Sequence, residues 1–173
     1  MNLSLENIKK NIESNKPQNL EDSLEKLRAH FKGINNQESP YKEIIESYLN
    51  DTLNTLFKYY SETSKVPLDT KIEKTKNILS EMKNLNNNNN FKKKFDENAL
   101  KYDEGITYCL EAEKIRKKGD KDSYREAYIK YREGLDKGIS CDDLVNHMQV
   151  WKKNMFEAFC KKCIETKRNY KNS

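Results

Sequence analysis

A helical hairpin in the second half of the chain most constrains what this sequence can fold into. After Gly119, bulky and small side chains recur every three or four residues: Ser123, Tyr124, Ala127, Tyr131, Gly134 and Leu135. That spacing puts them on one face of a helix, and the amphipathic segment that ends at Gly119 provides the preceding helix. The pattern therefore predicts helices that pack side by side and offer grooves, which favours binding over catalysis.

The composition predicts an all-α fold. Charged and hydrophobic residues each make up 35% of the 173 residues, and there are only 5 Gly and 3 Pro. This balance is typical of exposed amphipathic helices and argues against a large sheet core. No run approaches the roughly 18 to 20 apolar residues that cross a bilayer. We therefore expect a cytoplasmic protein without a transmembrane segment.

A run of five asparagines, Asn86 to Asn90, divides the chain near its middle. Asn side chains compete with the helical backbone for hydrogen bonds and add nothing to a core, so we interpret 86–95 as a linker. The predicted organisation is an N-terminal helical bundle of unknown role at 1–85, this Asn/Lys-rich linker, and a C-terminal three-helix antiparallel bundle at 96–173.

Four helices are expected before the linker, from apolar residues at helical spacing and from capping residues. They are a short helix with Leu5, Ile8 and Ile12, a helix from an Asn19 cap to Gly33, a helix from Ser39 and Pro40 to Tyr60, and a helix from about Pro67 to Met82.

Three longer helices are expected after the linker. Asp96 can cap a helix over 97–118, and Ser123 with Glu126 forms a capping box that opens a second helix. These boundaries are completed by Gly138, which closes the second helix, and by Ser140 with Asp143, which open a third helix that runs to about Tyr170.

Two glycines inside these helices predict a close backbone contact. The number of residues between Gly105 and the turn at Gly119 is similar to the number between the cap at Ser123 and Gly134. At a rise of about 1.5 Å per residue, each glycine lies about 17 to 21 Å from the turn, so the two face each other across the hairpin. Each glycine costs about 1 kcal/mol relative to Ala in a helix interior, and the close approach would explain why it is there.

Residues 97–170 resemble a microtubule-interacting and transport (MIT) domain. The resemblance is carried by Tyr124, Ala127 and Tyr131, by the preceding helix with Glu111, Ala112 and Glu113, and by the long helix that follows. It implies a three-helix bundle that holds short helical or extended tails of ESCRT-III proteins in grooves beside its third helix. It also implies a role in vesicle trafficking, at the periphery of endosomal membranes.

The expected third helix has a wide apolar stripe and many lysines, and it suggests where a partner could dock. One wall of the expected groove carries Tyr128, Ile129 and Arg132, and the other carries Lys152, Met155 and Phe156. The same stripe is also compatible with a fully buried core. Because this helix is basic, we expect a more acidic partner than family members usually bind.

No catalytic or metal-binding motif is recognisable. Cys160 and Cys163 form a C-x-x-C pair without a second pair, and positions three apart on a helix allow both thiols to pack as small hydrophobes. His30 and His147 lie in different halves and belong to no metal motif. We expect a non-enzymatic protein without a cofactor.

Two alternatives to peptide docking stay open. Nucleic acid could bind Phe91–Phe95, where three lysines lie between two phenylalanines, and residues 91–173 hold 20 basic against 15 acidic residues. A tetratricopeptide-like helical adaptor would use similar Tyr and Ala spacing, although no second repeat is found. Self-association is compatible with either reading.

Overall fold

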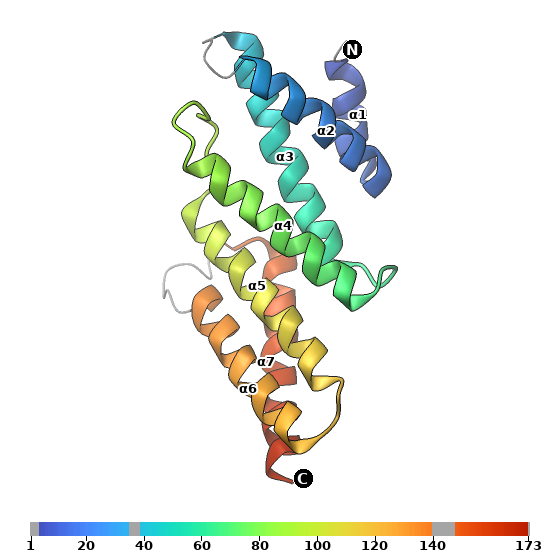
Figure 1. Cartoon of the computed structure of the whole chain (residues 1–173), viewed down its shortest axis with the longest axis vertical. Coiled ribbons are helices and arrows are strands. Elements are labelled where there is room, and N and C mark those ends of the chain that lie inside the picture. Colours follow the sequence, from blue (N-terminus) through green and yellow to red (C-terminus); the bar gives the residue numbers. More distant parts are fainter. Residues whose placement is uncertain (1–3, 35–38, 140–147, 173) are drawn as a thin grey trace. The chain divides into compact units, whose positions relative to one another are not determined.

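Capping side chains begin helices in both halves of the chain. The computed structural model describes residues 4–34, 39–139 and 148–172, and within these ranges every regular element is a helix (Figure 1). Ser4, Ser39 and Asp96 each accept a backbone hydrogen bond from the first turn that follows, as N-cap residues do. The helices are α1 (Leu5–Ser14), α2 (Pro17–Ile34), α3 (Pro40–Glu62), α4 (Leu68–Asn86), α5 (Glu97–Arg116), α6 (Lys121–Ile139) and α7 (Val150–Lys171). The all-α class is confirmed.

Two predicted caps are wrong. Helix α2 begins at Pro17, before Asn19, because proline suits the first turn of a helix. At α6 the capping carboxylate belongs to Asp120, which accepts the backbone N–H of Ser123 at 2.8 Å. These hydrogen bonds from Ser123 lower the pKa of the exposed Asp120.

The start of the third C-terminal helix differs from the expectation. Helix α7 is described from Val150, and the expected capping pair Ser140 and Asp143 lies outside the described residues. Of the described helices, none combines the length and the apolar character needed to span a bilayer.

Contacts group the chain into two units, which we describe separately. The N-terminal unit comprises Met1–Lys65 and Asn77–Phe95, and the C-terminal unit comprises Val66–Lys76 and Asp96–Ser173. The boundary expected at residue 85 puts helix α4 in the first bundle. In the structure, α4 contributes its beginning to the C-terminal unit and its end to the N-terminal unit.

Leucines at helical spacing form the core of the N-terminal unit. Their side chains are at most 1% exposed: Leu20, Leu24 and Leu27 of α2, with Leu49, Leu53 and Leu56 of α3. Polar contacts join the helices around this core. Tyr60 donates to Glu21 at 2.9 Å, and Arg28 makes a two-pronged ion pair with Glu81, so α2 is held to both α3 and α4.

The Asn-rich segment packs against the N-terminal unit. Phe91 is fully buried and Phe95 is 5% exposed, and the Phe91 ring meets the edge of Phe31 at 5.6 Å between centroids. The side-chain amide of Asn86 pairs with the backbone of Phe95, donating at 2.9 Å and accepting at 2.7 Å. The segment predicted as a linker at 86–95 thus groups with the N-terminal unit, where the amide of Asn86 supplies hydrogen-bond partners for the backbone of Phe95.

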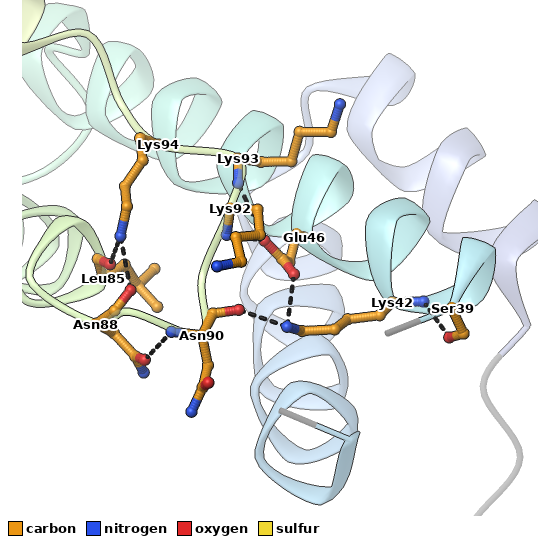
Figure 2. A network of polar contacts seen from close by, with 9 residues as sticks. All are labelled: Ser39, Lys42, Glu46, Leu85, Asn88, Asn90, Lys92, Lys93 and Lys94. Atoms are coloured by element: carbon orange, nitrogen blue, oxygen red, sulfur yellow. Dashed lines mark hydrogen bonds and ion pairs between the residues drawn. The ribbon is translucent and has the colours of Figure 1, made fainter. Parts of the chain in front are cut away.

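Glu46 of α3 also contacts the Asn-rich segment (Figure 2). Its carboxylate accepts the backbone N–H groups of Lys92 and Lys93, and it forms an ion pair with Lys42 at 3.5 Å. The Lys42 ammonium also donates to the backbone carbonyl of Asn90. Glu46 is 1% and Lys42 4% exposed, so both charged groups are buried and have their partners within the protein.

In the C-terminal unit, α5 and α6 approach each other at the predicted pair of glycines (Figure 1). A Cβ built on Gly105 would lie 2.6 Å from the carbonyl oxygen of Gly134, and one on Gly134 would lie 2.8 Å from that of Gly105. The predicted close contact is confirmed. One turn further along α6, Gly138 lies close to α7, because a Cβ there would collide with the ring of Phe156.

Helix α7 packs on both α5 and α6. Its inner face carries Phe156, Phe159 and Cys163, which are at most 4% exposed. The Phe159 ring lies 6.3 Å from that of the fully buried Tyr131 of α6. Three helices thus share one core.

Candidate interaction groove

A groove opens between α6 and α7 on the surface of the C-terminal unit. Its volume is about 360 Å³, and it is lined by Tyr128, Arg132, Cys163, Ile164, Lys167, Arg168 and Lys171. Ile164 is 54% exposed, so its apolar side chain forms part of the surface of this hollow. The groove therefore offers apolar surface together with charge.

Helical spacing explains why these residues line one furrow. Tyr128 and Arg132 are four positions apart on α6, and Ile164, Lys167 and Lys171 follow one another at intervals of three and four on α7. Residues at such intervals lie on the same face of a helix. The Lys167 ammonium lies 5.6 Å from the centroid of the Tyr128 ring, within reach of a cation–π interaction that joins the two walls.

The charged side chains that line the groove are all basic. Its lining contains four basic side chains and no acidic one. The outer surface of α6 shows how this arises, because its charges fall on two neighbouring ridges at about 100° per residue. One ridge carries Lys121, Arg125, Tyr128 and Arg132, and the other carries Asp122, Glu126, Ile129 and Glu133.

The structure brings two of the six predicted partner-binding residues into this groove. Tyr128 and Arg132 line it, whereas Ile129 does not. Ile129 is 47% exposed, but it directly follows Tyr128 in the chain and so lies on the acidic ridge. Its exposure does not make it part of the groove.

The other predicted wall is not open in the structure. Lys152 and Phe156 are 5% and 3% exposed, and Met155 is half-buried. The Lys152 ammonium forms an ion pair at 2.8 Å with Asp103 of α5, which is 1% exposed. The placement of Lys152 and Phe156 on an accessible wall is therefore wrong, because both belong to the inner face of α7.

The missed residues are Ile164, Lys167, Arg168 and Lys171, and counting from the connection between the helices would have found them. Tyr128 lies about three helical turns before the end of α6, and Ile164 lies about four turns after the start of α7. In antiparallel helices, residues at similar distances from the connection lie opposite each other. The same counting located Gly105 and Gly134 correctly but was not applied to α6 and α7.

The cysteines near the groove behave as packing residues. Burial raises the pKa of both the Cys160 and the Cys163 thiol, although Arg132 acts against this. Both thiols are therefore protonated at neutral pH and are poor nucleophiles. No cluster of three or more potential metal ligands occurs in the part of the chain that the structure describes.

The residues expected to bind nucleic acid are placed unfavourably for base stacking. Phe91 and Phe95 are buried, so neither ring is available to a base. The Lys94 ammonium donates at 2.6 Å to the backbone carbonyl of Asn88, close to the end of α4. The three lysines of this motif are exposed, and Figure 2 shows Lys93 pointing away from Glu46.

Comparison with known proteins leaves the groove to be interpreted from its own residues: no protein-family model, curated protein or solved structure matches this chain.

Proposed function

We propose that this chain is a non-enzymatic interaction module that docks a short helical segment of a partner protein in the groove between α6 and α7. The observation that carries the proposal is the half-exposed Ile164, which lies in a hollow between two helices and beside Tyr128. An amphipathic helix binds such a furrow by inserting apolar anchors between the two helix ridges.

The resemblance to MIT domains suggests the class of partner. Those domains hold ESCRT-III tails beside their third helix, and the groove described above lies beside α7, the last of the three helices after residue 96. We therefore propose an ESCRT-III-type tail in membrane trafficking as the partner, with the module acting in the cytoplasm at endosomal membranes.

The size of the groove favours reversible binding. A furrow of about 360 Å³ accepts one or two side chains of a partner. Interfaces of this kind fall at the small end of the range for protein complexes, which is typical of transient interactions. We expect a dissociation constant on the order of 10 to 100 μM, equivalent to roughly 5.5 to 7 kcal/mol.

Two exposed isoleucines provide a matched test of the proposal. Ile164 and Ile129 are similarly exposed and lie on neighbouring helices, but only Ile164 lines the groove. A labelled panel of ESCRT-III tail peptides would be titrated against the full-length chain by fluorescence anisotropy. We expect Ile164→Glu to weaken binding at least about tenfold, or about 1.4 kcal/mol, and Ile129→Glu to change it less than about twofold.

Two results would overturn the proposal. One is the absence of binding by every peptide in the panel at concentrations up to about 1 mM, well above the affinity range of transient complexes. The other is equal weakening by the two substitutions while circular dichroism shows both variants folded. That result would place the binding surface outside the groove.

A further inference from the structure

We propose that the segment bound between α6 and α7 is acidic: an amphipathic helix with one bulky apolar anchor and carboxylates in the adjoining turns. This inference rests on the proposed function and specifies the chemistry of its partner.

The four basic side chains of the groove lie together without a carboxylate in the lining, whereas several other basic side chains of the C-terminal unit are held in ion pairs. Outside the groove, ion pairs join Lys114 to Asp69 at 2.8 Å and Lys130 to Glu111 at 3.1 Å. Arg116 likewise reaches Glu165 at 3.4 Å. By contrast, no carboxylate among the described residues pairs with Arg132, Arg168 or Lys171. A cluster of one sign attracts ligands of the opposite charge.

The spacing of the residues on α7 matches a helical ligand. Ile164, Lys167 and Arg168, and then Lys171 occupy successive turns of the helix, which rise by about 5.4 Å each. A partner helix lying along α7 presents its own side chains with the same repeat. An apolar anchor over Ile164 would then place carboxylates one and two turns away, next to the lysines.

A purely structural explanation accounts for only part of the cluster. Arg168 and Lys171 lie in the last turn of α7, where basic residues stabilise a helix through its dipole. Arg132 lies in the interior of α6, and Lys167 precedes the last turn. Neither has this explanation, and both face the groove.

Three synthetic peptides that share leucine anchors at helical spacing would test the charge preference. One carries Glu at the flanking positions, one carries Gln and one carries Lys. Each is titrated against the full-length chain by anisotropy at low and high salt. We expect the Glu peptide to bind about tenfold tighter than the Gln peptide at low salt, and the difference to shrink with added salt because screening weakens exposed ion pairs. The Lys peptide should not bind.

A charge reversal in the protein makes the test reciprocal. The double variant Arg132→Glu, Lys167→Glu should lose the preference for the Glu peptide and gain binding to the Lys peptide. The matched control is Lys58→Glu, Lys101→Glu, which changes the net charge by the same amount at exposed residues outside the groove. The control should keep the preference of the unaltered chain.

The outcomes separate this inference from the proposed function. If the Glu and Gln peptides bind equally and Ile164→Glu weakens both, the groove is the docking site but the acidic preference is refuted. If none of the peptides binds, including the ESCRT-III panel, the proposed function itself fails. A single-stranded oligonucleotide that displaces the Glu peptide and binds more tightly would assign the charges to nucleic acid.

The acidic ridge of α6 defines one further outcome. It carries an exposed Ile129 among Asp122, Glu126 and Glu133, so a second copy of this chain would also offer an acidic segment. Light scattering over a range of concentrations measures this directly. Self-association that Ile129→Glu abolishes would overturn the assignment to a separate partner, whereas a monomer at all concentrations supports it.

Discussion

The lysines near the Asn-rich segment and the basic residues of the α6–α7 groove look alike in the sequence but differ in the structure. Near Glu46, basic side chains form ion pairs and hydrogen bonds within the N-terminal unit. Lys42 contacts Glu46 and Asn90, and Lys94 donates to the carbonyl of Asn88. In the groove, Arg132 and Arg168 remain open to a ligand. In the run from Phe91 to Phe95 the lysines are exposed but both phenylalanines are buried, so a run of charge along the chain does not by itself make an apolar binding surface.

Phe91→Ala tests this comparison with the largest expected effect. Truncating a fully buried phenylalanine leaves a cavity and should lower the free energy of unfolding by about 3 to 5 kcal/mol. Urea denaturation measures the change. Lys93→Ala, at an exposed neighbour, should change the free energy by less than about 0.5 kcal/mol. Equal and small effects would mean that the segment is a solvated linker after all.

A second test compares a tight and an open glycine. Gly134→Ala would bring a Cβ within 2.8 Å of both the Cys109 sulfur and the Gly105 carbonyl, and we expect it to lower the free energy of unfolding by about 1 to 3 kcal/mol. Gly33→Ala meets nothing within 4 Å, so it should raise the free energy by up to about 1 kcal/mol. Thermal melts that move in the same direction for both variants would contradict the close contact.

The buried pair of Asp103 and Lys152 predicts a pH dependence. Burial raises the pKa of Asp103 from 3.8 to about 6, and it outweighs Lys152, which lowers that pKa. Since the folded state binds this proton more tightly than the unfolded state does, the group stabilises the fold below about pH 4. That contribution is lost as the pH rises through about 6.

Denaturation at several pH values checks this prediction. The stability of the unaltered chain relative to Asp103→Asn should fall between about pH 4 and 6, by at most about 1.4 kcal/mol per pH unit. If the relative stability instead rises over that interval, Lys152 outweighs the effect of burial. The pair would then behave as an ordinary stabilising salt bridge.

The smallest expected effect concerns the groove. Because Arg132 is exposed and pairs with no carboxylate among the described residues, Arg132→Gln should change the free energy of unfolding by less than about 0.5 kcal/mol. A loss of more than about 1 kcal/mol in urea denaturation would mark Arg132 as structural. It would also weaken the contrast between the basic side chains that have partners near Glu46 and those that are open to a ligand in the groove.

Local patterns predicted the helices and one contact between them. Apolar residues at helical spacing located all seven described helices, and the Ser39 and Asp96 caps agree with the structure. Counting from the turn paired Gly105 with Gly134. These predictions succeed because helical spacing, capping and distance from a turn are properties of neighbouring residues.

The errors involve contacts between distant residues. Phe91 was assigned to a linker because its partner Phe31 lies far from it in the sequence and meets it only on folding. Lys152 was assigned to the surface because nothing beside it in the sequence indicates that Asp103 would meet it. For the groove, Tyr128 and Arg132 were found, but their partners on α7 were sought too close to its start.

The amino-acid sequence by itself determined which segments are helical, because side-chain periodicity and capping act over a few residues. It also determined the small residues at which α5 and α6 approach. Only the tertiary structure decided which charged side chains are available. The free energy of a charge depends on whether a distant carboxylate, carbonyl or apolar surface reaches it, as Asp103 reaches the ammonium of Lys152, and as none of the described carboxylates reaches Arg132.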